Sequence, residues 1–188
     1  LSEFKLYHPK GEYVLYNGVD TSKFYPKKTI KNQVFTIGCV ANFWEIKDQI
    51  TLIKSIIILR NKGVNIQARL IGSGLRLKSC KSFVIENSLS ENIFFEKEIA
   101  HEKLNDFYNE IDLLVLPSYY EALGCVYLES WATNTVFIAV DGQGISELIP
   151  DELKLNLLIN KSDELQLSDK INKIINKSIN FEFDMRYS

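Results

Sequence analysis

Residues 112–133 read DLLVLPSYYEALGCVYLESWAT, in which Asp112–Pro117 is a continuous apolar run, Ser118–Leu123 a loop and Gly124–Thr133 a segment with helical spacing. A short apolar run without alternation is typical of a strand that is buried on both faces of a parallel sheet. The helix after it would carry the chain back to begin the next parallel strand. The segment therefore predicts one β/α unit of an α/β domain.

The same alternation of short apolar runs and helical segments extends in both directions from this unit. The sequence predicts strands over residues 35–41, 64–71, 92–96, 136–140 and 153–159, and helices over residues 47–62, 75–88, 101–109 and 163–177. Right-handed crossovers would assemble these units into a doubly wound, mostly parallel, six-stranded Rossmann-like sheet of the α/β class. Ligands of such sheets bind at the carboxyl ends of the strands, so we expect the functional loops to follow Ala41, Ile71, Glu96, Pro117 and Val140.

Composition excludes several classes of protein. The 188 residues contain 22 Lys and Arg against 24 Asp and Glu, a net charge of -2, so no general positive field exists to attract nucleic acid. Cys39, Cys80 and Cys125 are far apart and only two histidines accompany them, which argues against a structural metal site. We expect a reducing, cytoplasmic environment, and no apolar run approaches the length of a membrane-spanning helix.

Three of the expected loops contain groups suited to anions, each with a simpler explanation beside it. Lys47 opens a predicted helix, where it either attracts a phosphate together with the free helix amides or is only a solvated residue of the first turn. Gly72 and Gly74 either let a ligand approach the backbone or only make a tight turn, and Leu77 replaces the third glycine of a dinucleotide fingerprint. Residues 141–147 are either a second nest for oxygen atoms or a plain loop.

The loop before residues 124–133 contains the strongest group of candidate residues. Glu121 lies in the loop, Ala122 and Gly124 leave backbone amides accessible at the helix N-terminus, and Glu129 lies in the second helical turn. Such amides bind phosphate, and carboxylates accept hydrogen bonds from the hydroxyls of a sugar. A nucleotide sugar carries both groups, so the pattern predicts this ligand. The alternative is that Glu121 is a charge favoured by the helix dipole and Glu129 a solvated helix residue.

Beyond these local patterns, the order of the motifs is similar to that of one enzyme family. The motifs are LYNGVDTSKFYP (15–26), IGCVANFWEIKD (37–48), LIGSG (70–74), FYNEIDLLVLPSYYEALGCVYLESWA (107–132) and FIAVDGQGISELI (137–149). They resemble the C-terminal, donor-binding domain of GT-B glycosyltransferases, in particular the retaining family 4, also called glycosyl transferases group 1. The most specific element of the resemblance is the pair of glutamates at 121 and 129.

The resemblance implies retaining transfer of a hexose from a nucleoside-diphosphate sugar to a saccharide or lipid-linked acceptor, with no metal and no cofactor. It implies catalytic roles for Lys47, which would contact the diphosphate, and for Glu121, which would orient the donor sugar. The backbone amides of the loop after Glu121 would hold the sugar and the phosphate; these belong to Ala122, Leu123, Gly124, Cys125 and Val126.

The nucleoside end of the donor is also assigned by the resemblance. Glu129 would bind the ribose hydroxyls, and the loop formed by Glu96, Lys97 and Glu98 would border the base. Asn42 stands where the family usually has an arginine that binds phosphate. A neutral amide does not neutralise a phosphate, so we expect weaker binding of the diphosphate at this position.

The resemblance further implies how the chain is divided. Residues 1–33 would be a lead-in segment between domains, residues 34–178 the nucleotide-sugar binding domain, and residues 179–188 a truncated C-terminal tail. The family's N-terminal acceptor domain would be absent from this chain, which we therefore expect to bind the donor without transferring the sugar. The family's usual role in polysaccharide biosynthesis predicts a cytoplasmic protein whose full-length form associates peripherally with the inner face of the cell membrane.

The sequence is also compatible with two other functions. A noncatalytic nucleotide-sugar binding module would keep the fold and lose transfer, and the substitution at Asn42 favours it. A GT-B sugar-nucleotide epimerase would need protonatable groups beside the sugar, and the sequence does not single any out.

Overall fold

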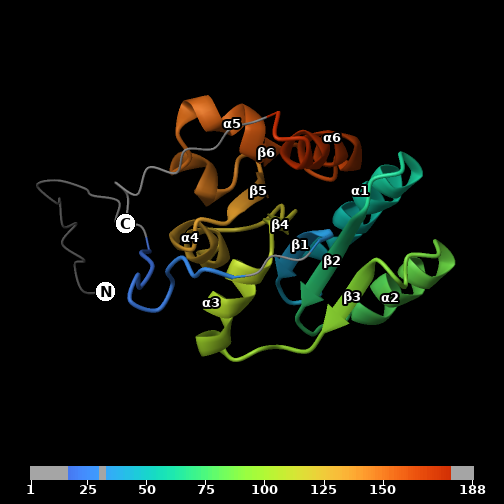
Figure 1. Cartoon of the computed structure of the whole chain (residues 1–188), viewed down its shortest axis with the longest axis horizontal. Helices are drawn as coiled ribbons and strands as arrows, with labels where there is room; N and C mark the ends of the chain where they lie inside the picture. The colour runs from blue at the N-terminus through green and yellow to red at the C-terminus, as the bar shows by residue number, and fades with distance from the viewer. Residues whose placement is uncertain (1–16, 30–32, 179–188) are drawn as a thin grey trace, which may run out of the picture.

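The computed structural model describes residues 17–29 and 33–178. Its centre is one parallel sheet with helices on both faces, and the strand order is β3-β2-β1-β4-β5-β6 (Figure 1). This confirms the predicted fold class, and every pairing between neighbouring strands is parallel. The strands of the described chain are β1 (Phe35–Val40), β2 (Ile66–Ile71), β3 (Ile93–Glu96), β4 (Leu113–Leu116), β5 (Val136–Val140) and β6 (Leu158–Ile159).

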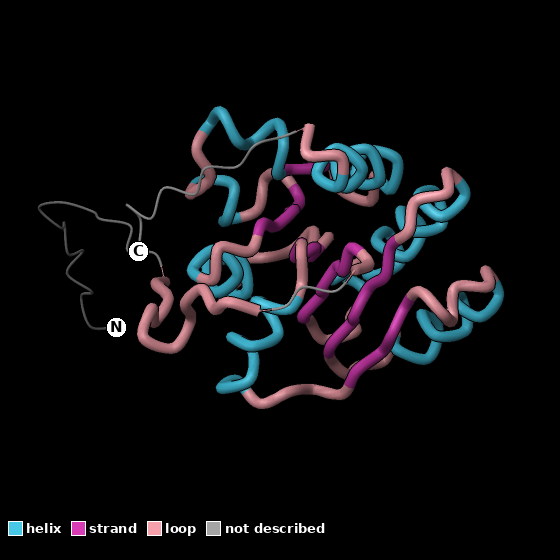
Figure 2. Tube along the Cα trace, in the orientation of Figure 1, coloured by secondary structure: helices cyan, strands magenta, loops and turns pink. Residues whose placement is uncertain are grey.

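Helices cover both faces of this sheet (Figure 2). On one side α1 (Gln49–Asn61) packs against α2 (Leu77–Glu86) and α6 (Glu164–Ile175), and on the other α3 (His101–Glu110) packs against α4 (Cys125–Ala132). The short helix α5 (Asp151–Leu157) contacts β5. Two single turns of 3₁₀ helix complete the elements, η1 (Glu45–Lys47) and η2 (Gly144–Glu147). None of the helices described is long and apolar enough to span a bilayer.

The strand order reverses between β1 and β4, the two central strands. Successive units run outward from β1 through β2 to β3, and the chain then returns to place β4 on the other side of β1, with Ile37 opposite Leu113. The loops that follow β1 and β4 therefore separate toward opposite faces and leave a crevice at the carboxyl edge of the sheet. This topology places residues 41–48 and 117–124 on the two sides of one crevice.

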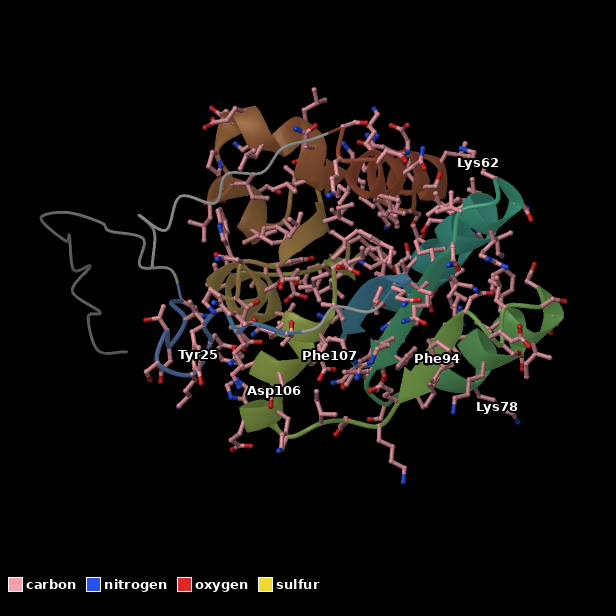
Figure 3. The ribbon with its side chains drawn as sticks, in the orientation of Figure 1. Tyr25, Lys62, Lys78, Phe94, Asp106 and Phe107 are labelled. Atoms are coloured by element: carbon pink, nitrogen blue, oxygen red, sulfur yellow. The ribbon has the colours of Figure 1, made fainter. Side chains whose placement is uncertain are left out.

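The close approach of α3 to the sheet depends on Gly38 in β1. A Cβ atom on Gly38 would lie 2.5 Å from Cδ1 of Ile111 and 2.8 Å from Cζ of Phe107. Figure 3 shows the Phe107 side chain between α3 and the sheet. Because protein cores have no room for an added carbon at these distances, a glycine is required at this position of the strand.

The prediction of a strand over residues 153–159 is wrong for most of its length. Leu153 and Leu157 belong to α5, and only Leu158–Ile159 form the strand β6. The alternating leucines imitate a strand, but Leu155 is 82% exposed and lies on the opposite side of a helix from its neighbours. Acidic residues in the first turn, Asp151 and Glu152, favour the helix at its N-terminus.

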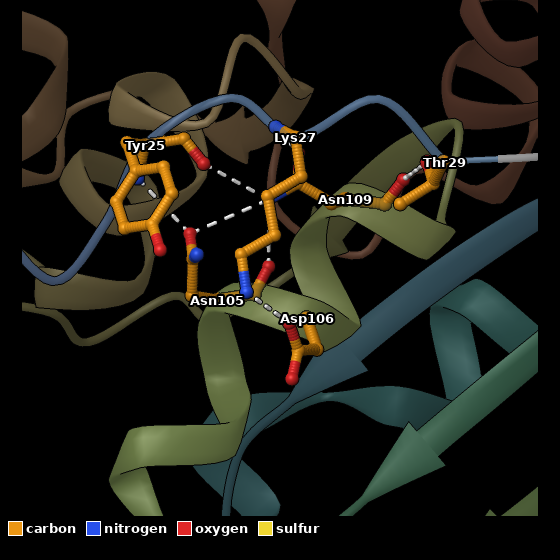
Figure 4. Close-up of polar contacts among 6 residues, drawn as sticks. All are labelled: Tyr25, Lys27, Thr29, Asn105, Asp106 and Asn109. Carbon is orange, nitrogen blue, oxygen red and sulfur yellow. Dashed lines mark hydrogen bonds and ion pairs between the residues drawn. The ribbon is translucent and has the colours of Figure 1, made fainter.

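Part of the predicted lead-in segment packs against α3. The backbone amides of Tyr25 and Lys27 donate to the Oδ1 atoms of Asn105 (3.0 Å) and Asn109 (2.6 Å), and Asn109 Nδ2 donates back to the Tyr25 carbonyl at 3.1 Å. Figure 4 shows how the extended segment follows this helix. Phe24, at 3% exposure, enters the core. Residues 17–29 are thus bound to the domain, whereas the predicted tail, residues 179–188, lies outside the described residues.

Candidate functional site

A cavity of about 300 Å³ lies at the carboxyl ends of β1, β2 and β4. It occupies the crevice that the reversal of strand order predicts. Seven residues proposed from the sequence lie in its lining: Asn42, Lys47, Glu98, Glu121, Gly124, Cys125 and Val126. Loops that are more than 70 residues apart in the chain, such as those of Lys47 and Glu121, meet here.

An ion pair joins the two sides of this cavity. Lys47 Nζ donates to a carboxylate oxygen of Glu121, and their side chains are only 20% and 16% exposed. Lys47 ends η1, and the following Asp48 has a left-handed backbone (φ +48°) that separates this turn from α1. Charges paired in a partly buried position interact more strongly than charges on an open surface. The cavity wall therefore contains one fixed ammonium group beside one fixed carboxylate.

The N-terminus of α4 opens at the same place. Gly124 is the N-cap residue with φ +77°, and no side chain caps the helix there. Cys125 and Val126 form the first turn and line the cavity. The N–H groups of a first helical turn have no partner within the helix, and they carry the positive end of the helix dipole. Together with Lys47, this end of α4 makes the cavity suitable for a group with negative charge.

The loop of η2 holds the Glu121 loop in position. The amide of Glu121 donates to Oε1 of Gln143 at 2.8 Å, and the amide of Gly144 donates to the Glu121 carbonyl at 3.3 Å. A Cβ atom on Gly144 would lie 1.5 Å from the carbonyl oxygen of Ala122. Residues 141–147 therefore support residues 121–124 by direct backbone packing, and nothing in the sequence pattern had singled out Gln143.

The glycine pair after β2 has a packing role of the same kind. A Cβ atom would lie 2.2 Å from the Ala41 carbonyl oxygen at Gly72, and 2.7 Å from the Phe43 carbonyl oxygen at Gly74. The amide of Phe43 donates to the Ser73 carbonyl at 2.7 Å, which ties the two loops together. This close approach explains both glycines, and Gly72 also lines the cavity.

Glu129 lies one helical turn beyond the cavity lining. Its side chain is 9% exposed; Oε2 accepts a hydrogen bond of 2.7 Å from the Tyr108 hydroxyl, and Oε1 lies 3.3 Å from His101 Nε2. Burial, together with the Glu129 carboxylate, raises the pKa of Tyr108 well above its ordinary value, so this hydroxyl remains a donor. Glu129 shares a helix face with Cys125 and Val126. It is therefore adjacent to the residues that line the cavity, and His101 and Tyr108 are neighbours that the sequence pattern did not identify.

Of the three residues predicted to border the base, only Glu98 lines the first cavity. Both oxygens of Glu96 contact Arg69, at 2.5 Å from Nε and 3.0 Å from Nη2, so this carboxylate is held within the sheet. Glu98 Oε1 accepts a hydrogen bond from the Ser73 hydroxyl. Glu96, Lys97 and Glu98 line a second cavity of about 420 Å³, and Glu98 is also in the lining of the first.

The apolar part of the first cavity was not anticipated from the sequence. Ile99 and Leu104 line it next to Glu98, and they come from the loop after β3 and from the first turns of α3. The signal was an isolated apolar residue, Ile99, within the polar run EKEIAHEK. The loop after β3 and α3 thus add apolar side chains to a cavity that also contains the Lys47–Glu121 ion pair.

The cysteines differ in their surroundings. Burial raises the pKa of the Cys39 thiol to about 12, and burial also raises the pKa of Cys80. Cys125 is exposed and lines the cavity. Within residues 17–29 and 33–178, no cluster of three or more His, Cys, Asp or Glu side chains is arranged to hold a metal ion.

Comparison with known proteins agrees with this architecture. The crystal structure of the C-terminal domain of a glycosyl transferase group 1 family protein, LpcC from Francisella tularensis, superposes with a TM-score of 0.75 at 26% identity, covering 86% of this chain and 89% of that one. Anabaena HepE, solved with UDP and glucose, shares the fold with a TM-score of 0.75 at 19% identity, covering 88% of this chain and 48% of HepE.

A curated relative points to the same family. The lipopolysaccharide core biosynthesis mannosyltransferase LpsB of Rhizobium meliloti is 28% identical over 167 residues, which cover 81% of this chain and 47% of LpsB. The chain thus spans about half the length of this relative. The family described as glycosyl transferases group 1 matches residues 20–188. With its parallel sheet, its crevice at the strand reversal and this match over most of its length, the chain belongs to the glycosyl transferases group 1 family.

Proposed function

We propose that this chain is the donor-binding part of a GT-B, family 4 glycosyltransferase and that it binds a nucleoside-diphosphate sugar in the cavity between β1 and β4. The observation that carries the proposal is the meeting of the Lys47–Glu121 ion pair with the uncapped N-terminus of α4 in one cavity. A diphosphate matches the positive groups, and the hydroxyls of a sugar match the carboxylate.

In this proposal the diphosphate contacts Lys47 and the amides of Gly124, Cys125 and Val126, while Glu121 orients the sugar. The departing nucleotide gains negative charge as its bond to the sugar breaks. Groups already fixed in position stabilise that charge, and each donor contributes about 2–4 kcal/mol to lowering the barrier. Positive charge from the chain itself is therefore proposed to suffice without a metal or another cofactor.

We propose that the ribose binds beside Glu129. The carboxylate keeps its hydrogen bond with the buried Tyr108 hydroxyl, and its longer contact of 3.3 Å with His101 is the one exchanged for a ribose hydroxyl. The nucleoside then extends toward the loop after β3, where Ile99 lines the cavity.

Transfer is proposed to retain the configuration of a hexose and to use a saccharide or lipid-linked acceptor. Two relatives support the choice of a hexose, since LpsB is a lipopolysaccharide core biosynthesis mannosyltransferase and HepE was solved with UDP and glucose. Because the chain spans about half of each of these proteins, we assign the acceptor site to the remainder of a full-length enzyme. We propose that this enzyme works in the cytoplasm, associated peripherally with the inner face of the membrane, in the synthesis of a surface polysaccharide.

A noncatalytic nucleotide-sugar binding module is the second candidate function. Asn42 lines the cavity beside Lys47, so the site presents a neutral amide where the resemblance places a second cation. Asn42→Arg in the full-length protein separates the candidates. If the protein is a transferase, the unaltered form turns over its donor. If it is a binding module, neither the unaltered protein nor the Asn42→Arg variant shows turnover.

Binding of nucleoside diphosphates to this chain tests the proposed function. Calorimetric titration with UDP and GDP should give saturable binding, and Lys47→Met should weaken it by about 10- to 150-fold, because a hydrogen bond to a charged group contributes about 1.5–3 kcal/mol. Lys54→Met is the matched control, since Lys54 lies on α1 with its side chain 44% exposed and pairs with Glu164 at 3.6 Å. Equal losses for both variants, or no binding by the unaltered chain, would refute the proposal.

A further inference from the structure

The orientation of a bound nucleotide follows from the order of the strands whose loops line the cavity, and this orientation rests on the proposed function. Lys47 and the N-terminus of α4 follow the central strands β1 and β4, whereas Glu98 and Ile99 follow β3 at the edge of the sheet. A nucleoside diphosphate whose diphosphate contacts Lys47 and α4 therefore carries its base toward Glu98. The apolar side chains there suit the faces of a planar base, and its edge needs polar partners.

Two carboxylates lie in this region, and their partners differ. Both oxygens of Glu96 are engaged by Arg69, which also contacts Glu110 at 2.7 Å. If Glu96 moved toward a ligand, the partly buried guanidinium of Arg69 would lose one of its two carboxylate partners, and breaking such an ion pair costs free energy. Glu98 is exposed and is bound to the neutral hydroxyl of Ser73. A ligand replaces that hydroxyl without separating an ion pair, so Glu98 is the carboxylate that can be used for recognition.

Glu98 also lies at the junction of two cavities. It lines both the cavity of about 300 Å³ and the neighbouring one of about 420 Å³, and the two share Gly72 as well. Ser73, the hydrogen-bond partner of Glu98, lines the second cavity. A base that takes the Glu98 carboxylate from Ser73 therefore lies beside this second cavity.

We propose that Glu98 reads the edge of the base and selects a guanine nucleotide over a uracil nucleotide. The two oxygens of a carboxylate accept in parallel from the N1–H and the exocyclic N2–H of guanine, a charge-assisted pair with bidentate geometry. Uracil presents a single N3–H between two carbonyl oxygens, which a carboxylate repels. Adenine and cytosine offer one amino group beside a ring nitrogen that accepts, so they gain only one such bond.

The expected selectivity is that of one bidentate contact to a base. Such a contact discriminates against the wrong base by about 5- to 150-fold. The donor of the proposed enzyme is then a sugar linked to guanosine diphosphate. This assignment concerns the class of nucleotide and is independent of which hexose is transferred.

Calorimetric titration of this chain with GDP and with UDP tests the inference. The unaltered chain should bind GDP at least about 5-fold more tightly than UDP. Glu98→Gln should remove the preference, because the glutamine amide has an NH₂ donor in place of one carboxylate oxygen. This donor opposes an N–H of guanine, whereas it can donate to a carbonyl oxygen of uracil. Glu91→Gln, at an exposed position before β3, is the matched control and should leave the ratio unchanged.

The outcomes separate this inference from the function on which it rests. Equal affinities for GDP and UDP, a preference for UDP, or a GDP preference that survives Glu98→Gln would overturn the role of Glu98 while nucleotide binding itself stands. Absence of binding to either nucleotide would overturn the proposed function together with the inference. Melting temperatures of the two variants, measured alongside, show that each remains folded.

Discussion

Substitution of Gly124 by alanine tests how the start of α4 is built. Gly124 has φ +77°, and an added Cβ atom would lie 2.7 Å from two ring carbons of Tyr127 and 3.1 Å from Cγ of Glu121. The Tyr127 ring is fully buried and its hydroxyl donates to the Leu116 carbonyl at 2.8 Å, so the ring has no free space into which it can turn. The added methyl group must therefore displace the Glu121 loop or distort the core.

Two costs add in Gly124→Ala. A left-handed conformation costs a residue with a Cβ atom about 1–2 kcal/mol, and overpacking a core by one methyl group costs about 1–3 kcal/mol. We expect a loss of about 2–5 kcal/mol in the free energy of unfolding as their sum. Two other glycines separate the conformational cost from the packing cost. Gly142 has φ +74° but no atom within 4 Å of an added Cβ, so it reports the conformational cost alone. Gly18 has neither a left-handed backbone nor an atom within 4 Å, so it reports neither cost.

Urea unfolding of the three variants measures these terms. Gly142→Ala should lose only the conformational cost of about 1–2 kcal/mol, and Gly18→Ala should be neutral or more stable by up to about 1 kcal/mol. Gly124→Ala should also weaken nucleotide binding, because the displaced loop carries Glu121. If Gly124→Ala and Gly142→Ala lose the same stability, the described contact between Gly124, Tyr127 and Glu121 is refuted.

Three further predictions follow from buried and exposed side chains. Because burial raises the pKa of the Cys39 thiol from its ordinary 9.0 to about 12, the unfolded chain loses this proton first and stability falls between pH 9 and 12. Cys39→Ala should show a shallower fall in unfolding free energy over that range, and an unchanged slope contradicts this. Iodoacetamide at pH 8 should label Cys125 in the folded chain before Cys39 or Cys80, and bound nucleotide should slow the labelling of Cys125. Mass spectrometry measures the order of labelling, and earlier labelling of Cys39 or Cys80 contradicts the prediction. Tyr127→Phe should cost about 1–3 kcal/mol in urea unfolding by leaving the Leu116 carbonyl without its donor, whereas unchanged stability shows that this bond contributes nothing.

The sequence predicts the sheet well because each buried parallel strand forms a continuous apolar run that is visible within a few residues. Runs such as residues 113–116 are apolar without interruption, and each is followed by a segment with helical spacing. The exception is residues 153–159, where alternating leucines imitate a strand, whereas the acidic first turn after Pro150 favours a helix. The alternating pattern reports only which side chains are apolar. Which of them are buried decides between a strand, with a repeat of two residues, and a helix, with a repeat of about 3.6 residues, and the sequence alone does not give that burial.

The candidate site could be predicted only in part, because pairing between distant residues is not visible in a local pattern. The loops of Lys47 and Glu121 were expected at the same edge of the sheet, since both follow parallel strands, and the structure pairs the two side chains. The role of Glu96 depends on Arg69, 27 residues away on the neighbouring strand, and no local signal connects them. Gln143 likewise contacts Glu121 from a separate loop.

A crystal structure of this chain with bound GDP tests the central claim most directly, because it locates the diphosphate itself. We predict a diphosphate at the N-terminus of α4 with an oxygen within hydrogen-bond distance of Lys47 Nζ, and a base beside Ile99. A nucleotide bound with its phosphates away from both Lys47 and the first turn of α4 would contradict it.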